Sequence, residues 1–127
     1  MPNELVLIVD DNEKNVKLAR DVLRFAGFRT LEAGTAGDGI SLAGEHLPDV
    51  ILMDIRLPDM DGMTAVRKLK DDPRTAGIPV VAVTSFAMKG DRERFLAERF
   101  DGYLEKPISI REFPDQVQSF CRPEGGS

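Results

Sequence analysis

At 127 residues, with 42% hydrophobic and 31% charged side chains, the chain suits one folded domain and leaves no room for a second, so we expect a single domain over 1–127 without a separate output domain. Its 17 Lys and Arg against 22 Asp and Glu give a net charge of −5 with no local basic patch, which argues against binding nucleic acid. A lone cysteine, no charged-then-apolar leader and no apolar run near ~20 residues predict a cytoplasmic protein without a membrane partner.

Short β-branched runs alternate with amphipathic stretches along the chain, which is the pattern of parallel strands joined by crossover helices. The runs at 5–9, 50–53 and 79–83 are continuously apolar and indicate central strands that helices cover on both faces. Pro79 stands at the first position of its strand, where its missing N–H does least harm. The runs at 28–33 and 102–105 are more polar, and we place them nearer the sheet edges.

Helical spacing of apolar residues predicts the first three helices. Apolar positions from 16 to 26 follow residues 11–12 and share one face, and Gly27 ends this helix. Thr35 and Asp38 resemble a capping box and begin a second helix that reaches about residue 45. Its glycines weaken it, so we expect packing to hold it. A third helix carries apolar positions 63, 66 and 69 and ends at the Asp72–Pro73 pair.

The last two helices are less regular. We expect the fourth over about 90–99, with apolar positions 95, 96 and 100 in the core rather than on a docking surface. Ser109 and Glu112 form a capping box before the fifth helix. Pro114 lies where a helix begun at residue 110 already needs its N–H, so this helix kinks or starts late. The core therefore spans about 5–120, and 122–127 form a flexible tail.

Polar residues follow four of the predicted strands at their carboxyl ends, where doubly wound sheets bind ligands. They are Asp10, Asp11, Asp54, Thr84, Ser85 and Lys106. Two carboxylates ~4 Å apart repel by about 4 kcal/mol at an effective dielectric constant of ~20, so a cluster recruits a cation or raises pKa values. Mg²⁺ suits such oxygen ligands and can neutralise a phosphoryl group as it is transferred to a carboxylate. The set is interpreted as a phosphoacceptor site in which Lys106 and Thr84 contact phosphoryl oxygens.

Each of these residues also has a structural interpretation when it is taken alone. Asp10 and Asp11 before a helix fit an N-cap and a first-turn acid. Thr84 fits a structural hydroxyl, and Lys106 fits an ordinary loop lysine. The interpretation as a site depends on their occurrence together at separate strand ends.

Four motifs carry a family resemblance. They are LVLIVDDN (5–12), VILMDIRLPDMDG (50–62), PVVAVTSFAMKGD (79–91) and GYLEKPI (102–108). In order and spacing they resemble response-regulator receiver domains over about 5–120, and residues 85–90 are most similar to single-domain cell-cycle-type regulators. The resemblance implies a flavodoxin-like α/β fold, in which five helices flank a doubly wound five-stranded parallel sheet of order 2-1-3-4-5.

The resemblance also implies residue roles. Asp54 resembles the phosphoacceptor, and Mg²⁺ is implied at Asp10, Asp11, Asp54 and the backbone carbonyl of Arg56. The other implied roles are Thr84 as switch hydroxyl, Lys106 as phosphoryl contact, Tyr103 as switch aromatic and Pro107 as cis proline. Phosphorylation then changes the face made by the fourth helix, fifth strand and fifth helix. Tyr103 has an alternative interpretation as a core aromatic of an edge strand.

The implied phosphodonor is a sensor histidine kinase or a histidine phosphotransfer protein, and the implied target is an unknown protein. We expect the chain to be a monomer or a weak dimer, and we expect it not to be an enzyme. Long Arg56 and bulky Phe86 predict slow loss of the phosphoryl group, because such side chains limit access of water. One alternative is a receiver-like docking module that takes no phosphate. Another is a haloacid-dehalogenase-type aspartate phosphatase, which needs an acid where Arg56 stands.

Overall fold

The computed structural model describes residues 3–84, 93–94, 97–106 and 108–121. Its elements are β1 (Leu5–Val9), α1 (Glu13–Phe25), β2 (Arg29–Ala33), α2 (Ala36–His46), β3 (Val50–Asp54), α3 (Gly62–Asp71), β4 (Val80–Thr84), β5 (Gly102–Glu105) and α5 (Phe113–Phe120). Between β4 and β5, residues 93–94 and 97 are helical. Phe86, Phe95, Leu96, Pro107 and the tail 122–127 lie outside the described residues, so the predictions made for them stand as predictions.

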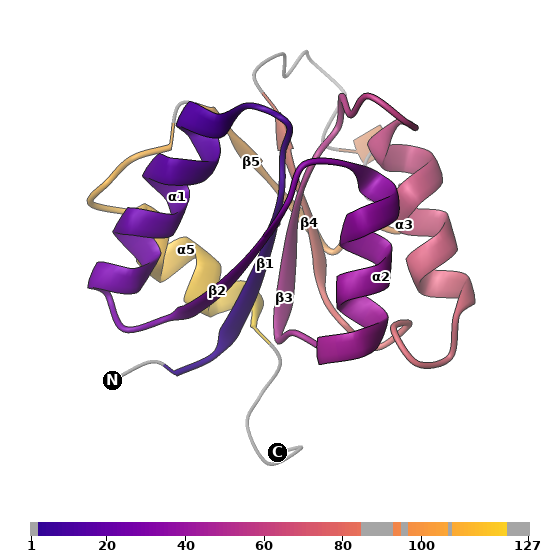
Figure 1. The fold of residues 1–127 in the computed structure, drawn as a ribbon, viewed down its shortest axis with the longest axis horizontal. Coiled ribbons are helices and arrows are strands. Elements are labelled where there is room, and N and C mark those ends of the chain that lie inside the picture. Colours follow the sequence, from indigo (N-terminus) through magenta and orange to yellow (C-terminus); the bar gives the residue numbers. More distant parts are fainter. Residues whose placement is uncertain (1–2, 85–92, 95–96, 107, 122–127) are drawn as a thin grey trace.

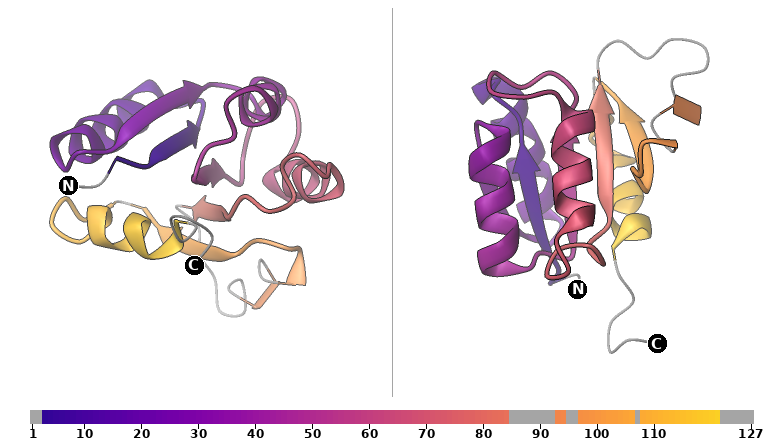
Figure 2. Two further views of the ribbon diagram at one scale, coloured as in Figure 1. Left: turned by 90° about the horizontal axis from the view of Figure 1, so that it is seen from below. Right: turned by 90° about the vertical axis from the view of Figure 1, so that its right-hand side faces the viewer.

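The five strands form one parallel sheet in the order β2-β1-β3-β4-β5, which confirms the predicted order and the edge positions of β2 and β5. Helices α1 and α5 cover one face, and α2 and α3 cover the other (Figures 1 and 2). Within β1, Leu7 and Val9 pack under α2 and α3, whereas Val6 and Ile8 pack under α1 and α5. Both faces are buried, which explains why the strand sequences are continuously apolar.

Strand bounds agree closely with the predicted runs. The runs predicted at 5–9 and 102–105 match β1 and β5, while β4 begins at Val80, one residue after Pro79. The carbonyl of Pro79 accepts a hydrogen bond from the Ile51 N–H at 2.9 Å, so Pro79 joins the sheet through its acceptor although it has no N–H to donate. Strand β3 extends one residue beyond the apolar run and includes Asp54, which therefore sits at the carboxyl end of a central strand.

Side chains and glycine set the ends of α1 and α2 as predicted, whereas the predicted capping box of Ser109 and Glu112 does not cap α5. The Thr35 hydroxyl accepts a hydrogen bond from the Asp38 N–H and caps α2, and Gly27 follows α1 with φ of 104°, in the left-handed region that glycine adopts without strain. Helix α5 starts late, at Phe113, which places Pro114 in its first turn. The Ser109 hydroxyl accepts from the Glu112 N–H, so this bond closes a turn before the helix rather than capping the helix itself.

The glycines of α2 allow a close approach to the sheet. A Cβ at Gly39 would lie 2.7 Å from Val9 Cγ2, which is too close for any other residue without a shift of the helix. Residues Ala36 and Ala43 of the same helix are fully buried. Small side chains therefore bring α2 against the end of β1, and packing compensates for the low helix propensity of glycine.

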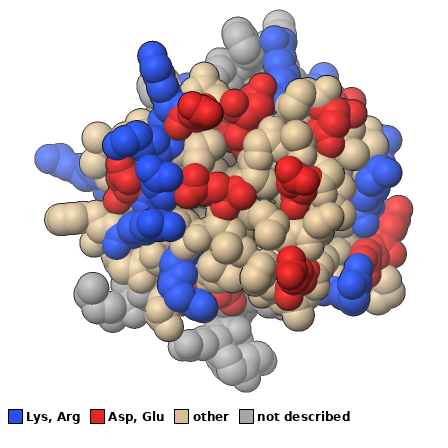
Figure 3. Space-filling view, in the orientation of Figure 1, with Lys and Arg blue, Asp and Glu red and all other residues tan. Residues whose placement is uncertain are grey.

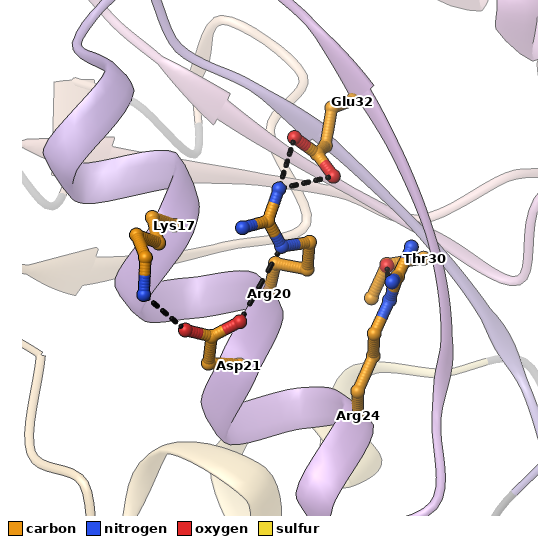
Figure 4. Close-up of polar contacts among 6 residues, drawn as sticks. All are labelled: Lys17, Arg20, Asp21, Arg24, Thr30 and Glu32. Atoms are coloured by element: carbon orange, nitrogen blue, oxygen red, sulfur yellow. Dashed lines mark hydrogen bonds and ion pairs between the residues drawn. The ribbon is translucent and has the colours of Figure 1, made fainter.

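Polar contacts fasten α1 to the edge strand β2 (Figure 4). Arg20 Nη1 lies 3.2 Å from Glu32 Oε1, and Arg24 Nε donates to Thr30 Oγ1 at 2.8 Å. Lys17 pairs with Asp21 one turn along the helix at 2.8 Å. Exposed ion pairs such as Arg20–Glu32 and Lys17–Asp21 add little to stability, because solvent screens them. Across the described part of the chain, no helix has the length and apolar character needed to cross a membrane.

Candidate functional site

The predicted site residues meet at one edge of the sheet, the upper edge in Figure 1. Asp10 follows β1, Asp54 is the last residue of β3, Thr84 is the last residue of β4, and Lys106 follows β5. Parallel pairing of neighbouring strands brings these four ends together, and two backbone bonds extend the ladder beyond the strands. The Asp10 N–H donates to the Ala33 carbonyl at 3.0 Å, and the Lys106 N–H donates to the Thr84 carbonyl at 2.8 Å.

One ammonium group contacts two carboxylates at the centre of this edge. Lys106 Nζ lies 2.8 Å from Asp10 Oδ2 and 3.3 Å from Asp54 Oδ2. These side chains are nearly buried, with 12% of Lys106, 8% of Asp10 and 14% of Asp54 exposed. The other oxygens accept backbone donors, with Asn12 N–H on Asp10 Oδ1 at 2.9 Å and Arg56 N–H on Asp54 Oδ1 at 3.2 Å. Backbone and lysine together fix both carboxylates.

The surroundings of Asp54 disfavour its charged form. Burial raises the pKa of Asp54, the Lys106 charge opposes this, and the Asp10 charge adds to it, so the pKa lies above its ordinary value. Burial opposes the charge of Lys106, but the hydrogen bond to Asp10 and the charge of Asp54 outweigh this and raise the pKa of the lysine. Lys106 therefore stays protonated, whereas burial and Asp10 penalise the charged form of Asp54.

Three carboxylates are close enough to share a cation. Asp10, Asp11 and Asp54 each offer an oxygen, and these three atoms lie within 4.8 Å of one another. Lys106 carries one positive charge, which does not by itself balance three carboxylates. The all-oxygen donor set and the excess negative charge fit a hard divalent cation such as Mg²⁺.

A cavity of about 250 Å³ opens over Asp54. It is lined by Asp11, Asn12, Asn15, Asp54, Arg56, Thr84 and Lys106. The lining includes the predicted site residues Asp11, Asp54, Arg56, Thr84 and Lys106, and the buried Asp10 contacts Lys106. Tyr103 does not line this cavity, and Pro107 lies outside the described residues. Asn12 and Asn15 were not predicted as site residues, although their position one and four residues after the acid pair was a usable signal. Such a cavity accommodates a small oxyanion beside a cation.

Tyr103 lies on β5, where its ring is half-buried and packs against the core on the α2 and α3 side of the sheet. Its hydroxyl donates a hydrogen bond to Glu105 Oε1 at 2.9 Å. Phe100, predicted as core, is 3% exposed. The Tyr103 ring therefore packs against the core, while its hydroxyl reaches Glu105 at the exposed end of the strand.

Charge is unevenly spread over the surface. In the space-filling view, basic side chains gather on the side of α1, whereas acidic side chains are spread over the rest of this face, including its upper part (Figure 3). The exposed residue Asp11 adds a carboxylate to the lining of the cavity.

Comparison with known proteins agrees with this geometry. The family model for the response regulator receiver domain matches residues 6–118. The polar-differentiation response regulator DivK of Brucella ovis is 45% identical over 115 residues, which cover 91% of this chain and 94% of that protein. A CheY-like receiver domain from Methanospirillum hungatei JF-1 is 27% identical, with a TM-score of 0.83 and 93% of each chain covered.

A further solved structure bears on the acidic cluster. It is the receiver domain of a sensor histidine kinase from Pseudomonas aeruginosa PAO1, with 31% identity, a TM-score of 0.85, and coverage of 94% of this chain and 98% of that one. That domain has a magnesium ion coordinated in its active site cleft.

Proposed function

This chain belongs to the response-regulator receiver domain family, and we propose that it is a phosphoacceptor of a two-component or phosphorelay system in which Asp54 takes the phosphoryl group. The proposed donor is a sensor histidine kinase or a histidine phosphotransfer protein, and a separate protein reads the result. The observation that carries the proposal is the Asp54 carboxylate at the floor of an acidic cavity, 3.3 Å from the Lys106 ammonium. The proposed nucleophile Asp54, the Lys106 ammonium group and the proposed metal site thus lie close together.

In the proposed step, an Asp54 carboxylate oxygen attacks the phosphorus of a phosphohistidine. The new P–O bond forms as the P–N bond breaks, and the imidazole leaves with the bonding pair. Lys106 Nζ already contacts Asp54 Oδ2 and pairs with the phosphoryl oxygens, and Thr84 at the cavity wall donates its hydroxyl. Asp10, Asp11, Asp54 and the Arg56 carbonyl would hold Mg²⁺, which would neutralise charge on those oxygens when bound.

The proposed output is a change in the face that includes residues 90–99, β5 and α5. A phosphoryl group brings about −1.5 to −2 charge and three acceptor oxygens to the cavity, and its bonds with Thr84 and Lys106 favour one of two arrangements. Tyr103 shares a face of the sheet with Thr84, so we propose that its bond to Glu105 breaks when Thr84 moves. The chain passes on a conformation and turns over no substrate.

The test is phosphorylation by acetyl phosphate with Mg²⁺, followed by intact-mass analysis. The wild type is expected to gain the mass of one phosphoryl group, and Asp54→Asn is expected to gain none because the nucleophile is absent. Asp115→Asn, which removes an exposed acid in the first turn of α5, is the matched control and keeps the modification. A wild type that responds to neither acetyl phosphate nor beryllofluoride would instead support the docking-module alternative.

Slow hydrolysis of the Asp54 acyl phosphate is part of the proposal. Arg56 lines the cavity, and its long side chain limits access of water to the phosphoryl group. We expect Arg56→Asn and Phe86→Ala to shorten the half-life severalfold, measured as loss of the added mass after the donor is removed. Wild-type decay that is as fast as decay in both variants would contradict this expectation.

A further inference from the structure

The loop between β3 and α3, residues 55–61, is closed at its base. Arg56 and Asp61 form an isolated antiparallel bridge, and the Gly62 N–H donates to the Ile55 carbonyl at 2.8 Å. Asp61 Oδ1 also accepts from the Thr64 N–H at 2.7 Å and so caps α3. These bonds fix where the loop leaves Asp54 and where it enters α3, but they do not hold its tip.

The tip is held by Asp59, which bonds to a different helix. Asp59 Oδ1 accepts from the Ala36 N–H at 2.9 Å, and Oδ2 accepts from the Gly37 N–H at 2.8 Å. These are the first two residues of α2, whose N–H groups have no acceptor within the helix. Hydrogen bonds from Gly37 and Ala36 lower the pKa of Asp59, so the carboxylate stays charged at the positive end of the helix dipole.

Glycine at position 37 makes room for this contact, because a Cβ there would lie 3.2 Å from Asp59 Oδ2. Helix α2 is itself packed tightly, with Gly39 against Val9, the residue before Asp10. The tip of the loop is therefore tied to an element that is fixed beside the first acid of the cluster. The base of the same loop follows the third acid, Asp54.

We propose that Asp59 is a positioning residue for the cation and phosphoryl site. By holding the tip of the 55–61 loop on α2, it sets the backbone of Arg56, whose N–H donates to Asp54 Oδ1 at 3.2 Å. The inference rests on the proposed function, because it assigns Arg56 a place at the cation. Asp59 touches none of the three clustered acids through the bonds described, so it acts through the loop.

The test compares Asp59→Asn and Asp59→Ala with the control Asp38→Asn. Asp38 is an exposed acid in the first turn of α2, so the control removes the same charge from the same helix end without touching the loop. Mg²⁺ binding to the unphosphorylated protein is measured by calorimetry, and the amide signals of Ala36, Gly37 and Arg56 are followed by NMR without metal. Both Asp59 variants are needed because the alanine variant alone also removes side-chain volume.

We expect the Asp59 variants to bind Mg²⁺ about 10-fold more weakly, at the low end for groups that orient a metal ligand. Their Ala36 and Gly37 amides should exchange faster and the Arg56 amide signal should shift, whereas Asp38→Asn should match the wild type in all three measurements. If the Asp59 variants kept their Mg²⁺ affinity while the Ala36 and Gly37 amides exchanged faster, the contact of Asp59 with α2 would be merely structural and the proposal would be overturned. An equal loss of Mg²⁺ affinity in Asp38→Asn would also overturn it. Failure of the wild type to bind Mg²⁺ would instead overturn the proposed function, and the positioning role with it.

Discussion

Replacing Lys106 with methionine is expected to lower the free energy of unfolding by about 3–5 kcal/mol in magnesium-free buffer. Lys106 Nζ is 2.8 Å from Asp10 Oδ2 and 3.3 Å from Asp54 Oδ2, and all three side chains are nearly buried. Methionine keeps most of the apolar stem but leaves two carboxylates facing each other without the ammonium group. The loss reflects that uncompensated charge rather than the net value of the ion pair.

Urea unfolding with and without Mg²⁺ measures this effect. A cation at the three acids replaces part of the missing charge, so Mg²⁺ should stabilise Lys106→Met as well as the wild type, by about 2.7 kcal/mol at a hundredfold excess over the dissociation constant. Lys68→Met, at an exposed position of α3, is the control and should change stability by less than about 0.5 kcal/mol. A loss in Lys106→Met no larger than in this control would show that Lys106 does not compensate the carboxylates.

The sheet and the centre of the site could be predicted because both follow from the strands. Continuous apolar runs identify buried parallel strands, and parallel strands necessarily bring their carboxyl ends to one edge. Asp54, Thr84 and Lys106 therefore had to meet once the strands were identified, although they are separated by up to 52 residues. Sequence pattern alone gave no distances, and the particular bond between Lys106 and Asp10 emerged only from the structure.

Contacts that depend on loop conformation were not predictable in the same way. Asp59 accepts hydrogen bonds from Ala36 and Gly37, which are 23 and 22 residues away in the sequence, because of the turn that the 55–61 loop makes. The periodicity of the sequence does not predict that turn. The backbone of Arg99 is another example. Arg99 has φ of 78°, a conformation that favours glycine, and its Nη1 lies 2.7 Å from Asp71 Oδ1 on α3. The ion pair accompanies a backbone conformation that sequence composition would not have assigned to arginine.

Asp54→Asn is expected to have the opposite effect to Lys106→Met and to stabilise the protein at neutral pH by about 1–2 kcal/mol. Asparagine removes the cost of burying the Asp54 charge and its repulsion from Asp10, and together these outweigh the lost attraction to Lys106, because the pKa of Asp54 is raised. Asparagine keeps an oxygen that accepts from the Arg56 N–H, so the local backbone bond survives. The proposed nucleophile thus weakens the fold that holds it.

The difference in stability between Asp54→Asn and the wild type should depend on pH. Burial and Asp10 raise the folded pKa of Asp54 above the ordinary value of 3.8, so between these two pKa values the folded state holds more protons than the unfolded state. Ionised Asp54 therefore destabilises the wild type at neutral pH, and this penalty disappears as the pH falls through the folded pKa toward 3.8. The advantage of Asp54→Asn, measured by urea unfolding at a series of pH values without Mg²⁺, should shrink over the same interval. The stability difference between the control Asp115→Asn and the wild type should not change over this pH interval. If Asp54→Asn were less stable than the wild type at neutral pH, the attraction of Lys106 would outweigh burial and the repulsion from Asp10.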